Sequence, residues 1–395
     1  MITREHYISK LREFYDSDLI KIITGIRRSG KSIILKQIMD ELKNQNAHVF
    51  YLNFEDYRIL SQIPDADSLI KYFDERIVHG EQNYLFLDEI QEVKDWHLAC
   101  RTLRLEEGVS IFITGSNSKL LSGEFTSELG GRHVTLRVRP FVYKEILAYS
   151  KELGFIPSVS DYLVWGGFPK RFEFKTAEAR DLYLQDLVQS IVEKDLIARY
   201  HIENTDLFRR VARFVLRSNA RIFSARSIES YLKNEHIVGS VNTIIKYLSY
   251  LEEAYVIDRI SPYSERTKAD LKYTVKIYNA DPALNSINVT DGRFDVTHNL
   301  ENIVYNELIY MGYDLRVLGG EDGELDFVAV KGGKKYCIQV AYSVAEDKVY
   351  DREMSAFKYA DVDAEKILIT NDEFDYSTAL VRHIRLPEFL VMEHL

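Results

Sequence analysis

Residues 25–32 have the types and spacing of a loop that binds phosphate. The segment GIRRSGKS fits the pattern G-x-x-x-x-G-K-[ST], and it lies between the apolar run IKIIT and the helical pattern IILKQIMDEL. Glycines let such a loop curl until backbone N–H groups at a helix N-terminus point at phosphate oxygens. The sequence therefore predicts a nucleoside triphosphate site whose contacts are Gly25, Arg28, Ser29, Gly30, Lys31, Ser32 and Ile33.

Four side chains divide the chemistry of this site. Lys31 is expected to neutralise the β and γ oxygens, and Ser32 to place its hydroxyl on Mg²⁺. Asp88 and Glu89 follow the apolar run YLFL, at the carboxyl edge of a sheet where ligands bind. We expect Asp88 to hold the magnesium through water and Glu89 to polarise the attacking water, which favours hydrolysis over binding alone.

Later polar residues are candidates for the γ-phosphate. The run SIFITGSN ends in Ser116 and Asn117, and either side chain can face the phosphate from a neighbouring strand end. Arginines follow in GGR and RVRP, where one of them can act on the site of a neighbouring copy in a ring-forming ATPase. For each arginine, an ordinary surface position is the alternative.

Hydrophobic patterns predict the elements that position these residues. Up to residue 140, apolar runs such as YLFLD and IFITG alternate with helical patterns, which is typical of parallel strands covered by helices on both faces. Residues 141–204 have helical patterns interrupted by WGGFP, and we interpret this segment as a helical lid with a break between helices. We thus expect an α/β class protein of several domains.

Residues 205–280 have the pattern of a winged helix. Three helical patterns are followed by two apolar runs with a polar stretch between them, and Ser224 and Ser240 stand where helix N-caps are expected. From Asp206 to Lys276 there are 13 Lys and Arg against 8 Asp and Glu, a local charge of +5 in a chain of net charge -10. We expect double-stranded DNA to be held through Arg209, Arg210, Arg213, Lys246, Lys268 and Lys272.

Composition limits the classes of protein to which the chain can belong. No apolar run approaches the roughly 20 residues that cross a bilayer, and the N-terminus lacks the apolar stretch of a signal peptide, so we expect a cytoplasmic protein without a membrane partner. Cys100 and Cys337 have no metal-ligand spacing, and we interpret both as buried small hydrophobic residues.

The patterns of residues 281–395 predict the element order α-β-β-β-α-β.

The segments GIRRSGKS, YLFLDEI, ITGSN, GGR, RPFVYKEIL and WGGFP resemble the prokaryotic AAA+ ATPases of the extended winged-helix superclade. The resemblance covers nearly the whole chain and implies ATP as the nucleotide. It places Asn117 at a sensor position and makes Arg132 the better candidate for an arginine finger, with a homo-oligomer as its setting. It also implies that residues 281–395 are a restriction-endonuclease-like domain related to PD-(D/E)xK nucleases.

Such nucleases bind Mg²⁺ with a helix glutamate, a strand aspartate and an acid-x-lysine motif. Glu301, Asp326 and Gln339 occupy the first three positions here, which makes them a tentative second metal site, but Ala341 stands where the lysine is needed. We therefore expect an ATPase coupled to DNA whose nuclease-like domain is inactive. Two alternatives remain open: a nucleotide-gated switch that binds a protein partner, and an ATP-regulated, metal-dependent nuclease.

Overall fold

The computed structural model describes residues 2–43, 47–115, 129–260, 263–264, 269–270, 275–287, 295–320, 323–361 and 363–395. The chain divides into two compact units. The first is Met1–Pro140 with Glu253–Tyr255, and the second is Phe141–Glu252 with Val256–Leu395. Within the described residues, no helix is both long enough and apolar enough to cross a membrane.

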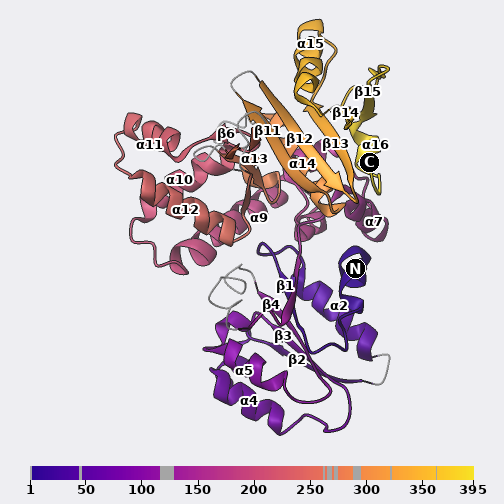
Figure 1. Cartoon of the computed structure of the whole chain (residues 1–395). Helices are drawn as coiled ribbons and strands as arrows, with labels where there is room; N and C mark the ends of the chain where they lie inside the picture. The colour runs from indigo at the N-terminus through magenta and orange to yellow at the C-terminus, as the bar shows by residue number, and fades with distance from the viewer. Residues whose placement is uncertain are drawn as a thin grey trace. The chain divides into compact units, whose positions relative to one another are not determined.

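A parallel five-stranded sheet forms the centre of the first unit (Figure 1). Its strands, in chain order, are β1 (Ile20–Thr24), β2 (His48–Asn53), β3 (Asn83–Asp88), β4 (Val109–Gly115) and β5 (His133–Arg137). Their order in space is β2-β3-β4-β1-β5, and every pair is parallel. Strands β1, β3 and β4 are buried along their whole length, as expected for strands covered on both faces.

Helices cover both faces of this sheet. They are α1 (Glu5–Arg12), α2 (Lys31–Lys43), the short α3 (Tyr57–Leu60), α4 (Ala66–Asp74), the 3₁₀ turn η1 (Ile90–Glu92) and α5 (Trp96–Leu103). Alternate strand residues, among them Ile22, Leu87 and Ile113, pack with α4 and α5 in one core, and α2 lies on the opposite face (Figure 1). The predicted α/β core of parallel strands is confirmed.

The second unit begins with helices. They are α7 (Tyr143–Leu153), α8 (Val159–Trp165), the 3₁₀ helix η3 (Pro169–Glu173), α9 (Ala177–Ser190) and the π-helix η4 (Ile191–Ala198). The predicted break falls between α8 and η3, because Gly166 has φ 66° and ends α8. A Cβ at Gly166 would lie 1.6 Å from Asp281 Oδ1, and one at Gly167 would lie 1.9 Å from the Phe141 carbonyl oxygen. WGGFP thus lets two backbone segments pack closely.

Three helices and a small antiparallel sheet follow. The elements are α10 (Thr205–Arg217), β6 (Ile222–Phe223), α11 (Ala225–Asn234), α12 (Val241–Glu253), β7 (Ile257–Ile260) and β10 (Val275–Asn279), and the sheet order is β6-β10-β7. Ser224 and Ser240 accept hydrogen bonds from the N–H groups of Ser227 and Thr243, as N-caps do. Between β7 and β10, where the sequence predicts a polar stretch, the hairpin β8 (Tyr263–Ser264) and β9 (Ala269–Asp270) joins the C-terminal sheet.

The last segment builds a seven-stranded mixed sheet in the order β15-β14-β13-β12-β11-β8-β9. Its elements are α13 (Ala283–Ser286), α14 (Val296–Tyr310), β11 (Asp314–Gly320), β12 (Gly323–Lys331), β13 (Lys334–Ala341), α15 (Asp347–Ala356), η5 (Phe357–Tyr359), β14 (Glu365–Thr370), β15 (Val381–Arg385) and α16 (Leu386–Phe389). The predicted order α-β-β-β-α-β is present, and β15 and α16 extend it. Cys100 and Cys337 are free and buried, as predicted.

Candidate nucleotide site

The phosphate-binding loop joins the carboxyl end of β1 to the first residue of α2, Lys31. Gly25 has φ 139°, and a Cβ there would lie 2.1 Å from the Val138 carbonyl oxygen, so only glycine fits. Arg28 and Gly30 also have positive φ, 64° and 99°. The loop therefore curls as its sequence predicts, and it ends where the first N–H groups of α2 lack partners within the helix.

The side chain of Lys31 lies inside the curve of the loop. It is 4% exposed, and its Nζ donates to the carbonyl oxygens of Gly25 at 3.1 Å and Ile26 at 3.2 Å. The hydroxyl of Ser29 is buried and has no hydrogen-bond partner within the described part of the chain. A buried ammonium beside an unsatisfied hydroxyl is a polar cradle that an anionic ligand would complete.

Arg4 is a cation of this loop that the sequence motif does not contain. It is 2% exposed and donates to the carbonyl oxygens of Ser29 at 2.7 Å and Arg139 at 2.9 Å. It thereby ties the phosphate-binding loop to the segment that follows β5. No pattern in the sequence marks Arg4, because its partners lie far away along the chain.

Asp88 is the centre of the hydrogen bonds at this edge of the sheet. It is 1% exposed, and its Oδ1 accepts from Ser32 Oγ at 3.0 Å. Its Oδ2 accepts from the hydroxyl of Tyr51 at 2.9 Å, and Thr114 Oγ1 donates to Oδ1. The structure thus brings Ser32 and Asp88 together, as predicted, and adds Tyr51 and Thr114, which the sequence analysis missed.

Tyr51 stays a hydrogen-bond donor over the physiological range. Burial and the negative charge of Asp88 raise the pKa of its hydroxyl well above the usual value. Tyr51 pairs with Phe86 in the β2–β3 register, two residues before Asp88, so its side chain and that of Asp88 lie on the same face of the sheet. The sequence pattern that could have identified Tyr51 is its position two residues before Asn53 at the end of β2, which places both polar side chains on one face of the sheet.

Glu89 lies next to Asp88 with a backbone conformation that is unusual for its type. Its φ is 55°, in the left-handed region, which costs a non-glycine residue on the order of 1 kcal/mol. Its N–H donates to Thr114 Oγ1 at 2.9 Å, and its Oε2 accepts from Gln91 Nε2 at 2.6 Å. Thr114 therefore holds both acids, through the carboxylate of one and the backbone of the other.

The donor set fits ATP with magnesium. The Ser32 hydroxyl and the Asp88 carboxylate are oxygen ligands of the kind that Mg²⁺ prefers, and they already lie within hydrogen-bond distance of each other. Lys31, the loop backbone and the helix N-terminus supply positive potential for phosphates. This arrangement can hold the phosphates of a nucleotide beside a divalent cation.

The other residues predicted for this site lie elsewhere. Asn117 and Ser116 fall outside the described residues. Arg132 is exposed and precedes β5, and its carbonyl accepts from the N–H of Ile20 at the start of β1. It lies at the amino edge of the sheet, about 16 Å of strand away from the loop, so Arg132 does not reach the phosphates of its own chain.

The tentative second metal site holds a lysine. Glu301 and Asp326 do come together, but Lys276 Nζ of β10 lies 2.6 Å from Glu301 Oε1 and 3.2 Å from Asp326 Oδ1, and it also contacts Glu324. Gln339 turns its amide oxygen to the N–H of Asp326. Within the described residues, no group of three or more His, Cys, Asp or Glu is placed to hold a metal ion, and the metal site of Glu301, Asp326 and Gln339 stays a prediction.

Electrostatics explain why Lys276 keeps its charge. Burial lowers the pKa of Lys276, but the carboxylates of Glu301, Asp326 and Glu324 outweigh it, so the net pKa is raised. Burial and the charge of Asp326 raise the pKa of Glu301 to about 8. The cluster is an ammonium shared by three acids. Lys276 of β10 thus supplies beside these acids the positive charge that Ala341 cannot.

The residues predicted to hold DNA differ in their partners. Arg209 binds Glu193 through two hydrogen bonds, of 2.9 Å and 3.1 Å, and Arg210 pairs with Asp206 at 2.9 Å. Arg213 is exposed, and Lys246 lies 5.7 Å from the ring centre of Tyr250. Lys268 and Lys272 fall outside the described residues.

Comparisons with known proteins agree with this site. A family described as AAA domain matches residues 17–147, and a domain of unknown function, DUF8612, matches residues 156–290. DnaA of Aquifex aeolicus bound to AMPPCP superposes with a TM-score of 0.33 and 17% identity, covering 64% of this chain and 90% of that chain. Drosophila ORC bound to AT-rich DNA and Cdc6 gives 0.24 and 11%, covering 72% and 94%. Superpositions at these scores carry no argument about function.

Two relatives are similar over almost the whole chain. An uncharacterized protein of Haemophilus influenzae is 32% identical over 384 residues, which are 95% of this chain and 94% of that protein. The uncharacterized protein MJ1544 of Methanocaldococcus jannaschii is 30% identical over 379 residues, covering 90% of this chain and 82% of that protein. The chain therefore belongs to the family of these two proteins, and residues 17–147 are its AAA domain.

Proposed function

We propose that this protein hydrolyses ATP with Mg²⁺ at the loop of residues 25–32. The observation that carries the proposal is the contact between Ser32 and Asp88, with Glu89 as the next residue. Lys31 neutralises phosphate charge, Ser32 and Asp88 hold the magnesium ion, and Glu89 orients and polarises water. The ion supplies electrostatic stabilisation of the transferred phosphoryl group.

We further propose that ATP turnover is coupled to double-stranded DNA. The element order α10-β6-α11-α12-β7-β10 supports the winged helix expected from the sequence, with α12 as the third helix and the candidate for a DNA groove. The local charge of +5 over residues 206–276, in a chain of net charge -10, supports DNA binding by this segment. Arg209 and Arg210 remain candidate DNA contacts although each is paired with an acid. Exposed ion pairs are worth only about 0–1 kcal/mol, and DNA phosphates compete for the same arginines.

The nuclease alternative stays open, because Lys276 supplies beside Glu301 and Asp326 the lysine that Ala341 does not. Its ammonium competes with a divalent cation for the carboxylates of Glu301, Glu324 and Asp326. The other alternative is a switch that binds a protein partner through the second unit. It makes a different prediction, namely that duplex DNA neither binds nor changes turnover.

The test is ATP turnover measured with and without duplex DNA. We expect Mg²⁺-dependent phosphate release by the parent protein and a several-fold change on addition of duplex. Turnover that is insensitive to duplex would leave the ATPase proposal in place and remove the coupling to DNA. No release of phosphate under any condition would remove the ATPase proposal itself.

A further inference from the structure

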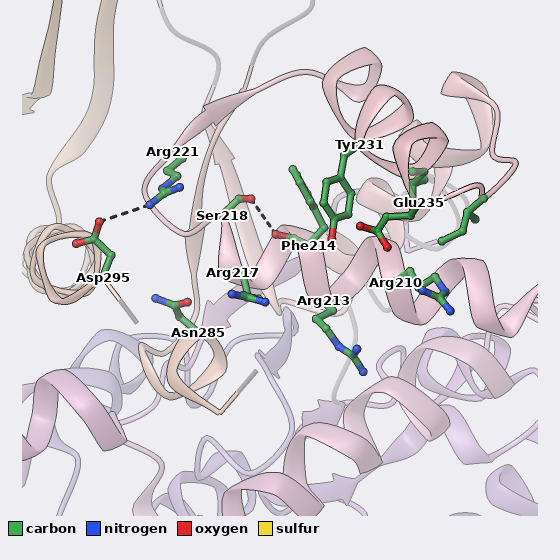
Figure 2. A pocket seen from close by; sticks show the side chains of 12 residues that line it. Arg210, Arg213, Phe214, Arg217, Ser218, Arg221, Tyr231, Glu235, Asn285 and Asp295 are labelled. Carbon is green, nitrogen blue, oxygen red and sulfur yellow. Dashed lines mark hydrogen bonds and ion pairs between the residues drawn. The ribbon is translucent and has the colours of Figure 1, made fainter. Parts of the chain in front are cut away.

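A pocket of about 430 Å³ lies beside α10 (Figure 2). It is formed by α10, by the turn that leads into β6, by α11 and by residues close to α13 and α14. Its wall contains a set of arginines and two aromatic rings: Arg210, Arg213, Arg217, Arg221, Phe214 and Tyr231. None of these features belongs to the nucleotide site of residues 25–32.

The arginines of the pocket gather positive charge on one face of α10. Arg210, Arg213 and Arg217 recur at helical spacing, so they stand above one another, and Arg221 follows at the end of the turn (Figure 2). Like charges three or four residues apart destabilise a helix, so packing alone does not explain the arrangement. An anion held among them would relieve this repulsion.

Two of these arginines have partners and two are available. Arg210 pairs with Asp206, and Arg221 donates to His298 at 2.9 Å and to Asp295 at 3.4 Å. Arg213 and Arg217 are exposed and make no side-chain hydrogen bond or ion pair with any residue that the structure describes. Guanidinium groups bind phosphate oxygens through paired N–H donors, so these two can hold one phosphate group.

The aromatic part of the pocket suits a nucleobase. The rings of Phe214 and Tyr231 lie 4.9 Å apart at an angle of 44°, and Phe214 also packs edge-on against Phe223. Tyr231 is 44% exposed, so a flat ring can stack on it. Glu235 lines the same pocket beside Tyr231 (Figure 2), and its carboxylate can accept hydrogen bonds from base N–H groups.

We infer that this pocket binds one nucleotide unit, with its phosphate on Arg213 and Arg217 and its base on Tyr231. The inference rests on the proposed association with nucleic acid and adds a pocket on α10, where Arg210 and Arg213 are also predicted contacts of duplex DNA. Nucleotides of this chemistry come either as free monophosphates or as units of a nucleic-acid strand. Both sources present one phosphate beside one base.

The experiment measures binding of fluorescently labelled oligo(dT) by anisotropy over a range of salt concentrations. The variants are Arg217→Gln and Tyr231→Leu, because neither residue is among those predicted to contact duplex DNA. The matched control is Arg226→Gln, an exposed arginine of α11 that does not line the pocket. Melting temperatures of all the variants check that each of them is folded.

We expect Arg217→Gln to weaken binding and to flatten the slope of log K against log salt by about 0.7, the value for one phosphate of a single strand that is no longer neutralised. Tyr231→Leu should weaken binding by about 5-fold or more, since it removes a stacking surface. Arg226→Gln should leave both quantities unchanged. An excess of dTMP that competes with oligo(dT) identifies a free nucleotide as the source, and retained binding without competition identifies a strand.

Three results would overturn the inference. They are no binding of oligo(dT) or dTMP at low salt, an equal effect of Arg217→Gln and Arg226→Gln, and an unchanged affinity of Tyr231→Leu. Duplex binding is measured in parallel on the same variants. If the protein binds duplex DNA but the pocket variants do not change oligo(dT) binding as expected, only this inference is removed. If the protein does not bind duplex DNA but the oligo(dT) results are as expected, only the coupling to duplex DNA proposed for α12 is removed.

Discussion

At the scale of single residues, Lys31 and Glu89 carry separable parts of the proposed reaction. Lys31→Ala removes the ammonium that faces the phosphates, so ATP affinity should fall below detection by calorimetry. Glu89→Gln keeps the phosphate cradle and removes only the charge that polarises water, so ATP should bind normally while turnover falls by about 10²-fold or more. Glu92→Gln, an exposed acid three residues further on, is the matched control. Parental turnover by Glu89→Gln would show that another group orients the water.

Lys276 is the second residue whose substitution has a testable effect, here on the stability of the folded protein. Lys276→Met takes away the ammonium shared by Glu301, Glu324 and Asp326, and breaking such a buried pair costs about 3–5 kcal/mol. Burial and Asp326 already raise the pKa of Glu301 to about 8, so acid that protonates Glu301 stabilises the folded state. Urea unfolding of Lys276→Met should therefore show a larger loss of stability in mildly alkaline than in neutral buffer.

The same variant tests whether the lysine replaces a metal. In a Lys31→Ala background, Mn²⁺ should raise the melting temperature of Lys276→Met and leave that of the Lys276 protein unchanged. Lys276→Met combined with Glu301→Gln should recover part of the lost stability, because one repelling charge is removed. A Mn²⁺-dependent rise with Lys276 present would show that the lysine does not block a cation site.

The sequence predicted those site residues whose roles depend on local spacing. Ser32 lies one residue from Lys31 within a motif, and Asp88 ends an apolar strand, so the local pattern alone identifies both. Tyr51, Thr114 and Arg4 were missed because their contacts depend on strand register and on chain crossings that no local pattern encodes. Lys276 was counted only as part of a basic segment for the same reason.

At the scale of elements, the break between α8 and η3 can be tested by two glycines that differ in their surroundings. Gly166 has φ 66° and no room for a Cβ, because Asp281 Oδ1 would lie 1.6 Å away. Gly154, the cap of α7, has φ 72° and open space around it. Gly154→Ala should cost about 1 kcal/mol, from the strained backbone alone, and Gly166→Ala should cost about 2 kcal/mol more. Equal shifts of the urea midpoint would show that WGGFP is not closely packed against Asp281.

Secondary-structure elements were predicted correctly where the hydrophobic residues of a segment follow one clear pattern. Strands β3 and β4, of six and seven residues, contain the apolar runs YLFL and IFI and are long enough to identify, whereas β5 has the sequence HVTLR and no such run. The two-residue strands β6, β8 and β9 are too short to carry a period, and pairing with distant partners decides their conformation. This is why the sequence predicts only a polar stretch, without strands, between the runs that form β7 and β10.

At the scale of the whole molecule, the position of Arg132 makes assembly testable. Because Arg132 lies at the amino edge of its sheet, it can act only on the site of another copy. Arg132→Ala should then lower turnover without weakening ATP binding, and mixing it with Lys31→Ala protein should recover part of the activity in mixed assemblies. Arg101→Gln changes an arginine of α5 that lines the same surface pocket as Arg132, and it serves as the control. Turnover per chain that is independent of protein concentration across the assembly range would exclude action between copies.

The last prediction concerns association of the whole chain with duplex DNA. The chain is acidic overall, so binding has to come from a local basic surface and should be sensitive to salt. Lys246 is the one Lys or Arg within α12, all of whose residues the structure describes, and it lies over Tyr250. α12 therefore offers few side chains that could contact base edges, and affinity for DNA should vary little between DNA sequences.

Replacing Arg209, Arg210 and Lys268 with alanine should weaken binding equally for two unrelated duplexes. The slope of log K against log salt should become shallower by about 0.9 for each phosphate that the variant no longer neutralises. The matched control replaces Arg58, Arg76 and Lys71 of the first unit, since Arg58 and Arg76 are also paired with neighbouring acids and the change in net charge is the same. A salt titration of affinity measures all of these quantities. If the first triple variant keeps the parental slope, or if the parent binds neither duplex at low salt, the result favours the alternative in which the second unit binds a protein partner.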